Sequence, residues 1–498
     1  MSKTERSPAT APNGTAIPCA RRAHFSLILA CALLLIFSAA ALPASAQTFT
    51  TLARFNGTNG ENPYSAPVQG PNGDFYGATG YGGANDQGVA YEMTPQGSLT
   101  LLHTFSESEA AQPFANLLLT SSGSFYSTSF EGGTSPFGSG TVFEMTPSGT
   151  VSVLYNFCTS TCADGANPND ALLLATDGNF YGTTLSNGTN GDWGSIFRMT
   201  PSGSLTTLYS FCSQPSCTDG SFPYGSLVQG ANGNFYGTTG DGGAQNDGSI
   251  FKITPSGTLT TLYSFCSLSG CTDGKIPYSG LVLASNGSFY GTTNFGGANG
   301  KGSIFKITPA GVFTSLYSFC SQPSCTDGSS PYAALIQATD GNLYGTTYRG
   351  GATNAGTIFK ISPSGAFSVM YNFCSQTNCR DGNLPIAGLV QSTNGSLYGA
   401  TTGGGSGNLG TIYRLSAGLH PFAQTVPPFG KAGAQIIILG NKLSSTTAVN
   451  FNGQPAAFTV VSDTEVMAAV PTGASTGAVT VSTSNGILKS NTKFQVLP

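Results

Sequence analysis

The stretch that decides the fold is residues 226–279, SLVQGANGNFYGTTGDGGAQNDGSIFKITPSGTLTTLYSFCSLSGCTDGKIPYS. Its central tyrosine, in the phrase FYG or a close variant, recurs along most of the chain, at Tyr76, Tyr126, Tyr181, Tyr236, Tyr290, Tyr344 and Tyr398. The steps between these tyrosines are 50, 55, 55, 54, 54 and 54 residues. A fixed period of this size is typical of a solenoid or a propeller.

Each unit contains four short runs rich in branched and aromatic residues, which is the pattern of β-strands. In the quoted unit we expect strands at residues 227–229, 234–239, 249–254 and 259–265. Ala-Asn-Gly separates the first two and Pro-Ser-Gly the last two, and both are tight-turn sequences. Each unit is therefore predicted to form one antiparallel four-stranded blade.

The fourth strand occurs seven times only if an isolated copy at residues 50–55 is counted, because the last unit leaves the pattern after Leu415. A closed ring explains this permutation, since the N-terminal strand then completes the last blade. An open solenoid would instead need polar capping repeats at its ends. We predict that residues 47–418 form an all-β, seven-bladed β-propeller closed by its N-terminal strand.

The first 46 residues differ in composition from the rest. Arg21 and Arg22 precede an apolar run at residues 25–42, and Ala44-Ser45-Ala46 provides a small-residue cleavage site. This pattern predicts a secretory signal peptide over residues 1–46. The alternatives are an uncleaved membrane anchor, because the run is about long enough to span a bilayer, and lipidation at Cys31. We expect no transmembrane segment in the mature chain.

The composition limits the function classes. Only 8% of the 498 residues are charged, but 32 Phe and 20 Tyr supply a core that disordered chains lack. The formal net charge of −4 gives no electrostatic basis for binding nucleic acid or an anionic membrane.

The composition changes after Gly418, where prolines mark a short linker. Runs typical of strands then follow at the spacing of a small sandwich, at residues 435–439, 448–451, 456–461, 466–470, 477–482 and 494–496. We expect residues 419–498 to form an immunoglobulin-like β-sandwich domain.

Two family resemblances support this organisation. The phrases NFYGTT, GSIFKITPSG and LTTLYSF, in series over residues 50–415, resemble the GloVer tandem repeat of exported bacterial "choice-of-anchor" proteins. That resemblance implies export and a propeller-like repeat, and no established activity. The tail, with GAQIIILGNKL, VNFNG and VPTGASTGAVTV, resembles a TIG/IPT immunoglobulin-like domain. That resemblance implies a spacer or interaction module of surface proteins.

Ten of the twelve cysteines form five close pairs, each in the crossover between two blades: Cys158 and Cys162, Cys212 and Cys217, Cys266 and Cys271, Cys320 and Cys325, Cys374 and Cys379. No second pair completes a four-ligand zinc site, and an exported chain favours disulfides, so we predict five bridges and no metal site. Each crossover ends in Asp-Gly, which we interpret as turn chemistry, with calcium as the alternative ligand.

The chain is poor in groups that titrate or attack near neutral pH. After residue 46 the only histidines are His103, in a strand position that is Tyr in the five following units, and His420, in the linker. We therefore predict neither catalytic residues nor a cofactor. The alternative is a carboxylate pair acting on a polysaccharide, for which Glu131 and Asp241 are the candidates.

All the long loops should share one face of the ring, and binding residues favour long loops on a rigid scaffold. On that face we expect ligand-binding side chains next to the Gly-Gly segments, at Tyr81, Glu131, Trp193, Asp241, Phe295, Tyr348 and Arg349. An aromatic set after proline, at Tyr64, Phe114, Tyr224, Tyr278 and Tyr332, could stack on sugars, but we expect it to pack against the neighbouring crossover.

These features predict a secreted or cell-surface protein that binds or scaffolds without catalysis, with a glycan or a cell-surface protein as partner. The alternatives are an extracellular polysaccharide hydrolase or lyase, and a purely structural surface protein.

Overall fold

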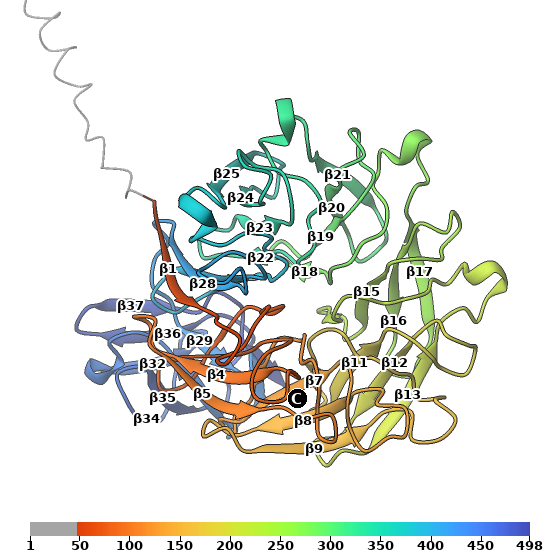
Figure 1. The fold of residues 1–498 in the computed structure, drawn as a ribbon. Coiled ribbons are helices and arrows are strands. Elements are labelled where there is room, and N and C mark those ends of the chain that lie inside the picture. The colour runs from red at the N-terminus through yellow and green to blue at the C-terminus, as the bar shows by residue number, and fades with distance from the viewer. Residues whose placement is uncertain (1–46) are drawn as a thin grey trace, which may run out of the picture. The chain divides into compact units, whose positions relative to one another are not determined.

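Strands make up nearly all the regular structure of residues 47–498, the part of the chain that the computed structural model describes. The expected signal peptide, residues 1–46, lies outside the described residues. The repeat region contains seven antiparallel sheets of four strands each and has a propeller-like fold (Figure 1). Within residues 47–498 there is no helix with the length and apolar character needed to cross a membrane.

The seven sheets are numbered here in chain order. Sheet 1 comprises β2 (Val68–Gln69), β3 (Phe75–Ala78), β4 (Val89–Met93) and β5 (Leu99–Thr104), and sheet 2 comprises β6 (Leu118–Leu119), β7 (Phe125–Ser129), β8 (Thr141–Met145) and β9 (Val151–Asn156). Sheet 3 comprises β10 (Leu173–Leu174), β11 (Phe180–Thr184), β12 (Ser195–Met199) and β13 (Leu205–Ser210). Sheet 4 comprises β14 (Val228–Gln229), β15 (Phe235–Thr239), β16 (Ser249–Ile253) and β17 (Leu259–Ser264).

Sheets 5 to 7 comprise β18 (Val282–Leu283), β19 (Phe289–Thr293), β20 (Ser303–Ile307) and β21 (Phe313–Ser318); β22 (Ile336–Gln337), β23 (Leu343–Thr347), β24 (Thr357–Ile361) and β25 (Phe367–Asn372); β26 (Leu389–Gln391), β27 (Leu397–Thr401), β28 (Thr411–Ser416) and β1 (Thr48–Arg54). The predicted strands of the quoted unit agree with β14–β17 to within one residue at each end.

The recurring FYG phrase builds the core of each sheet. In sheet 4, Tyr236 is fully buried, and its hydroxyl accepts a hydrogen bond from Asn232 Nδ2 at 2.9 Å. A Cβ on Gly237 would lie 2.5 Å from the ring of Phe251 on β16, so only glycine allows this ring to cover the strand. The tyrosines belong to clusters that join neighbouring sheets, as predicted.

Neighbouring sheets pack through buried clusters, and one such cluster joins sheet 7 to sheet 1. It contains Phe55, Phe75 and Tyr398, and the rings of Phe75 and Tyr398 stack with centroids 4.1 Å apart. The corresponding stack between sheets 3 and 4 joins Tyr181 to Phe235 at 4.0 Å. The first and last sheets are thus in the same kind of contact as sheets that follow one another in sequence.

A polar contact repeats in the same way. Between sheets 4 and 3, the side-chain oxygen of Gln229 accepts the backbone N–H of Thr176 at 3.0 Å. Between sheets 1 and 7, the side-chain oxygen of Gln69 accepts the backbone N–H of Thr393 at 2.9 Å. Because each glutamine lies on the first strand of its sheet, the same device links sheets 1 and 7 although 324 residues separate its partners.

The isolated N-terminal strand pairs as the sequence predicted. β1 runs antiparallel to β28, with Thr51 opposite Tyr413, and forms the outer strand of sheet 7. Phe49 fixes it further, because its ring stacks on Tyr371 of sheet 6 with centroids 3.7 Å apart.

The tail contains two four-stranded sheets and one two-stranded sheet around a shared core that includes Ile436, Val449 and Phe494. Its strands are β29 (Gln424–Val426), β30 (Phe429–Lys431), β31 (Gln435–Leu439), β32 (Ala448–Phe451), β33 (Gln454–Pro455), β34 (Phe458–Val460), β35 (Glu465–Ala469), β36 (Val479–Thr483), β37 (Gly486–Lys489) and β38 (Gln495–Leu497). A 3-10 turn, η5 (Leu443–Ser445), follows β31. The proline-rich segment predicted as a linker instead forms β29 and β30, because the prolines fall between the two strands.

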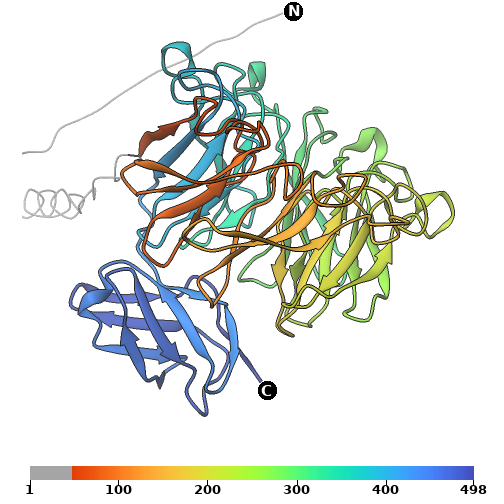
Figure 2. The ribbon, with the colours of Figure 1, turned by 60° about the horizontal axis from the view of Figure 1, so that its bottom comes forward.

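The tail contacts the tight turns of the repeat region. The hydroxyl of Thr464 donates to the carbonyl of Pro71 at 2.7 Å, and that of Thr393 donates to the carbonyl of Gly440 at 3.1 Å. Pro71 and Thr393 lie in the turns between the first two strands of sheets 1 and 7. The crossovers, with the 3-10 turns η1 (Pro215–Cys217), η2 (Ser269–Cys271), η3 (Pro323–Cys325) and η4 (Thr377–Cys379), lie on the other side of the sheets (Figure 2).

Candidate functional site

The two long loops of each sheet meet on the loop-rich face. The residue before Gly-Gly, in the loop between the second and third strands, forms a short antiparallel bridge with a residue of the preceding crossover. In sheet 4 this bridge joins Asp241 to Ser221. Equivalent bridges join Glu61 to Tyr81, Ala111 to Glu131, Ala166 to Ser186, Lys275 to Phe295, Ser329 to Arg349 and Asn383 to Gly403. Five of the seven predicted binding residues therefore occupy one structurally equivalent position.

The next residue of each crossover has a left-handed backbone and precedes a proline. In sheet 4 it is Phe222, with φ of 53°; its N–H donates to the Trp193 carbonyl of sheet 3, and its carbonyl accepts the N–H of Gly240. The same conformation and paired bonds recur at Asn62, Gln112, Asn167, Ile276, Ser330 and Leu384. Left-handed backbone is costly for residues other than glycine, so the two bonds hold each Pro-aromatic step in a fixed orientation.

The aromatic residues after these prolines contact one another from sheet to sheet. Ring centroids lie 4.5 Å apart for Tyr64 and Phe114, 4.6 Å for Tyr224 and Tyr278, and 5.0 Å for Tyr278 and Tyr332. Loop residues extend the two rows, which we call the aromatic collar: Tyr81, Tyr64, Phe114 and Phe130 in sheets 1 and 2, and Tyr224, Tyr278, Tyr332 and Tyr348 in sheets 4 to 6.

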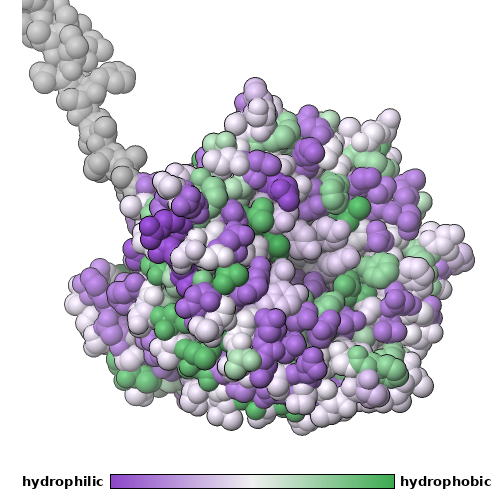
Figure 3. Space-filling model, in the orientation of Figure 1, coloured by the Kyte–Doolittle hydropathy of each residue, from purple (hydrophilic) through white to green (hydrophobic). Residues whose placement is uncertain are grey.

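The collar rings are partly exposed, and glycine makes room for them. A Cβ on Gly240 would lie 2.7 Å from the ring of Tyr224, and one on Gly80 would lie 2.6 Å from Phe114. These rings therefore cover the start of the long loops. In the space-filling view, weakly polar residues surround a recess in the middle of this face (Figure 3).

The tyrosine hydroxyls of the collar influence one another. Burial, with smaller contributions from Tyr278, Tyr224, Tyr64 and Tyr348, raises the pKa of Tyr332 to about 12. Burial, Tyr81 and Tyr348 likewise raise the pKa of Tyr64. Tyrosines of both rows thus lie close enough to interact, and Tyr64 and Tyr332 remain neutral hydroxyl groups at physiological pH.

Sheet 3 interrupts the collar with polar residues. Asn169 replaces the aromatic residue, and the carboxylate of the following Asp170 accepts the N–H groups of Ala171 and of Ser226 in sheet 4, both at 2.7 Å. Burial raises the pKa of Asp170 to about 6, although these hydrogen bonds favour the charged form. The carboxylate therefore joins sheets 3 and 4 at the break in the collar.

The predicted binding residues fall into three groups. Tyr81 and Tyr348 belong to the collar, and the guanidinium of Arg349 lies over the Tyr348 ring, 4.9 Å from its centroid. Trp193 and Phe295 are exposed by 37% and 40%, and Trp193 packs edge-on against Phe222.

The two carboxylates form the third group and are not brought together. Glu131, in sheet 2, accepts a hydrogen bond from Gln112 at 2.9 Å. Asp241 lies in sheet 4, where burial and the nearby Asp247 raise its pKa. No contact joins Glu131 to Asp241 in the described part of the chain, so the geometry gives no support to a paired-carboxylate mechanism.

Sequence reasoning missed the central role of the Pro-aromatic set. These rings do pack against the neighbouring crossover, as expected, because the partner ring belongs to the end of that crossover. They also form the continuous part of the collar, which Tyr81, directly before Gly-Gly, and Phe130 and Tyr348, one residue earlier, extend only at its ends. The available signal was the aromatic residue after proline in five of the seven units.

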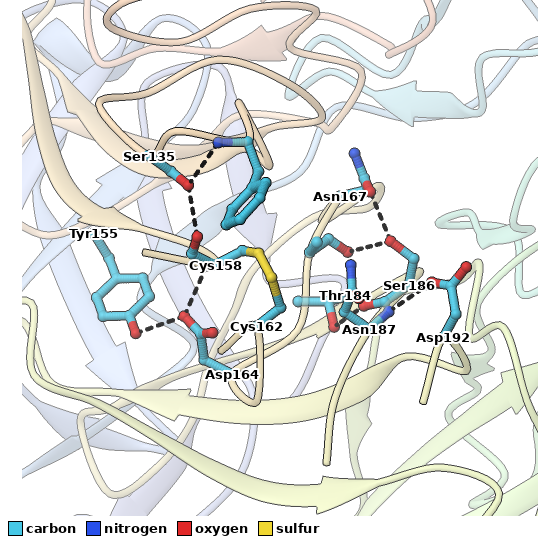
Figure 4. The surroundings of a disulfide bond; sticks show 12 residues. Ser135, Tyr155, Cys158, Cys162, Asp164, Asn167, Thr184, Ser186, Asn187 and Asp192 are labelled. Atoms are coloured by element: carbon cyan, nitrogen blue, oxygen red, sulfur yellow. Dashed lines mark hydrogen bonds between the residues drawn. A yellow bond between two sulfur atoms is a disulfide. The ribbon is translucent and has the colours of Figure 1, made fainter. Parts of the chain in front are cut away.

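The five cysteine pairs are disulfide-bonded, as predicted. In the crossover after sheet 2, the first that carries a disulfide, the carboxylate of Asp164 accepts hydrogen bonds from the Tyr155 hydroxyl at 2.9 Å and from the Cys158 N–H at 3.1 Å (Figure 4). In a later crossover the buried Asp273 accepts four, from Tyr263, Leu268 and the N–H and hydroxyl of Ser267. These carboxylates stabilise the loops through hydrogen bonds.

His103 has the same structural role as the tyrosines that it replaces. Its Nε2 lies 2.8 Å from Oε2 of Glu109 in the cysteine-free crossover after sheet 1. The equivalent Tyr209 donates its hydroxyl to Asp219 at 2.8 Å. His103 is thus a structural residue that ties its strand to the loop that follows.

Two clefts lie away from the collar. One, of about 390 Å³, lies between the crossover after sheet 5 and the outer strand of sheet 6, and Tyr317, Asp327 and Phe367 line it. The other, of about 340 Å³, lies between turns of sheets 5 and 6 and the tail, and its lining includes Gln337, Ile487 and Asn491. Neither cleft contains a predicted binding residue.

Comparison with solved structures found chains of low similarity. A protein provisionally named a gluconolactonase is 12% identical, with 76% of this chain and 94% of that protein covered and a TM-score of 0.41. The extracellular domain of a provisionally named hybrid two-component system from Bacteroides thetaiotaomicron is 12% identical, with coverages of 91% and 60% and a TM-score of 0.46. A provisionally named 6-phosphogluconolactonase from Bacteroides fragilis is 17% identical, with coverages of 64% and 85% and a TM-score of 0.41. Similarities this low do not indicate a function.

Comparison with curated proteins gave no match. Two family models do match. The IPT/TIG domain model matches residues 423–496, which include all the tail strands from β29 to the start of β38. The model described as the Gloeobacter/Verrucomicrobia repeat matches residues 68–283 and 267–453, which is most of the chain. The chain therefore belongs to the Gloeobacter/Verrucomicrobia repeat family and carries a C-terminal IPT/TIG domain.

Proposed function

We propose that this protein is an exported, non-catalytic binding protein that presents the aromatic collar to carbohydrate on a cell surface or in its surroundings. The collar is the single observation that carries the proposal. Partly exposed aromatic rings offer large flat contact areas, and tyrosine adds a polar tip, which suits the face and the hydroxyl groups of a sugar ring.

The proposal takes the repeat region, residues 47–418, as a closed seven-bladed propeller, and residues 419–498 as an immunoglobulin-like sandwich. The pairing of β1 with β28 and the Gln69 contact between sheets 1 and 7 support closure. A closed ring makes the collar rigid, because each Pro-aromatic step is bonded to two sheets. A rigid aromatic site loses little conformational entropy when a ligand binds.

Export is proposed from the N-terminal pattern over residues 1–46 and from the five disulfides, which persist in oxidising compartments. A disulfide that closes so short a loop contributes about 2 kcal/mol by loop-closure entropy. The tail, on the tight-turn side, would leave the loop-rich face open to a ligand.

A glycan array probed with the purified mature protein tests the proposal. We expect hits that are lost in a Tyr278→Leu/Tyr332→Leu double variant, because leucine keeps apolar volume but removes the flat ring. The matched control is Tyr278→Phe/Tyr332→Phe, since sheet 2 already carries Phe114 at this position, and it should retain the hits. An array without hits would refute carbohydrate binding and favour a structural role.

The rival function is polysaccharide cleavage on the same face. It predicts turnover of an array hit that is lost in a Glu131→Gln or Asp241→Asn variant. The separation of these carboxylates in sheets 2 and 4 argues against it, and product analysis of each hit by chromatography would decide between the two functions.

A further inference from the structure

The charges of the repeat region are divided between its two halves. Residues 55–248, which hold sheets 1 to 3 and the first two strands of sheet 4, contain fifteen acidic residues and a single basic one, Arg198. Residues 249–418, which run from the third strand of sheet 4 to the end of sheet 7, contain four acidic and eight basic residues. Of those four, Asp273, Asp327 and Asp381 are buried in the crossovers. Four of the eight basic residues lie on the third strands of their sheets, near the tight turns: Lys252, Lys306, Lys360 and Arg414. The other four lie in long loops of the loop-rich side: Lys275, Lys301, Arg349 and Arg380.

Two of these cations flank one short segment of the crossover into sheet 6. The backbone N–H of Ser330 donates to the Lys301 carbonyl of sheet 5 at 2.8 Å. The preceding Ser329 forms the bridge with Arg349 of sheet 6. Both Lys301 and Arg349 are exposed. The backbone of residues 329–330 thus contacts the backbone of one cationic residue in each of two neighbouring sheets.

The same segment positions the end of the collar. The Ser330 carbonyl accepts the N–H of Tyr348 at 3.0 Å, and Tyr332 follows two residues later, with its ring centroid 6.5 Å from that of Tyr348. The Arg349 guanidinium lies over the Tyr348 ring. The backbones of Lys301, Tyr348 and Arg349 are therefore all bonded to residues 329–330, two residues before Tyr332.

The equivalent positions of other sheets do not carry this combination. In place of Lys301 and Arg349, sheet 4 has Trp193 and Asp241, and sheet 2 has Gln87 and Glu131. At the boundary of the two halves, Lys275 is paired with Asp247, with Nζ and Oδ1 3.5 Å apart. Sheet 6 is thus the place where flat rings and unneutralised positive charge coincide.

We propose that Tyr332, Tyr348, Lys301 and Arg349, which we call the mouth of sheet 6, bind an acidic sugar unit, such as a uronic acid within a polysaccharide. The pyranose face would lie on Tyr332 and Tyr348, and the carboxylate would accept charge-assisted hydrogen bonds from Arg349 and Lys301. A guanidinium suits a carboxylate because it offers two parallel donors. This inference rests on the proposed function and specifies its ligand class. An acidic peptide would use the cations but not the stacked rings.

Isothermal titration of the full mature protein tests this inference, with hexagalacturonate as the probe and its methyl ester as the neutral counterpart. We expect the acid to bind at least tenfold more tightly than the ester and to weaken as salt rises. Arg349→Gln should weaken acid binding at least tenfold. Lys360→Gln, which removes a positive charge from β24 of the same sheet outside the mouth, should change it less than twofold. Unchanged melting temperatures would show that both variants fold.

Each other outcome is informative. Equal binding of acid and ester would overturn the acidic-sugar assignment and leave carbohydrate binding in place. Polyglutamate binding as tightly as the acid would overturn the sugar in favour of an acidic peptide. Failure of both probes, with array hits among other glycans, would refute the inference alone, whereas failure of both together with an empty array would refute the proposed function as well.

Discussion

Two tyrosines in the cores of neighbouring sheets provide a sharp test of the packing argument. Tyr91 on β4 and Tyr413 on β28 are fully buried, and neither hydroxyl has a hydrogen-bond partner within residues 47–498. Burial raises the pKa of both well above the usual range. The five other sheets carry phenylalanine at this position, at Phe143, Phe197, Phe251, Phe305 and Phe359.

Replacing either tyrosine by phenylalanine should therefore stabilise the protein. Burying a hydroxyl group without a partner costs about 1–3 kcal/mol, and the substitution removes that cost without leaving a large cavity. The two residues belong to different buried clusters, so the gains should add in the double variant. The free energy of unfolding, measured by urea denaturation under non-reducing conditions, should rise by about that amount for each change.

The reverse substitution supplies the matched control. Phe251→Tyr in sheet 4 places a hydroxyl in an equivalent core, so it should lower the free energy of unfolding by a similar amount. Refutation would come from Tyr91→Phe or Tyr413→Phe lowering the stability, because that result requires a hydrogen-bonded hydroxyl and a core different from the one described.

Three further predictions address closure, titration and the crossovers. Phe49→Ala should lower the free energy of unfolding by roughly 2 kcal/mol, below the range for a fully buried phenylalanine, and should speed hydrogen exchange in β28. Val312→Ala, exposed by 63%, should change the free energy of unfolding by less than about 0.5 kcal/mol. Intact protection of β28 in Phe49→Ala would contradict the role of Phe49 in holding β1 on β28. The pKa of Asp170 in the folded state, about 6, lies above its value in the unfolded chain. The free energy of unfolding of the wild type should therefore fall by up to about 3 kcal/mol as pH rises from about 4 to 6. Asp170→Ser, which introduces the residue that sheets 1 and 5 carry, should lack this pH dependence in melting experiments, and an equal dependence in the variant would exclude Asp170 as its source. Asp273→Asn should lower the free energy of unfolding by about 2–3 kcal/mol, because the new amide N–H₂ would face the groups that donate to the carboxylate. Asp340→Asn is the control and should be nearly neutral in the same denaturation assay, since Asn232 and Asn286 occupy this position in sheets 4 and 5. Equal losses of stability in the two variants would mean that the crossover carboxylate is not specifically required.

The sequence predicted most of the fold because the information needed was local and repeated. Seven copies of a four-strand pattern define the sheets, and the misplaced copy at residues 50–55 predicts the pairing of β1 with β28. The prediction failed at β29 and β30, where prolines suggested a linker. Pro427 and Pro428 lie between two short strands, where their missing N–H groups interrupt no ladder bond.

The collar was harder to predict because it depends on distances between sheets. The sequence shows that Tyr224, Tyr278 and Tyr332 occupy equivalent positions, but not that neighbouring rings approach to 4.6 and 5.0 Å. That separation follows from how far each sheet is rotated from the next. Comparing the units with one another separates fixed from variable positions. It therefore favours the variable residues before Gly-Gly as binding residues over the recurring aromatic ones.

The left-handed backbone next to the collar links the contacts between sheets to the proposed function. Phe222, Ile276 and Leu384 adopt left-handed backbone that costs each of them about 1–2 kcal/mol. Such strain persists only where the surroundings determine it, and here the two backbone bonds of each residue extend to two different sheets. The bond from Asn62 to Leu409 is the equivalent one between sheets 1 and 7. Losing that bond would release the strain there and free Tyr64, so the contacts that join sheets 1 and 7 also hold the collar in place.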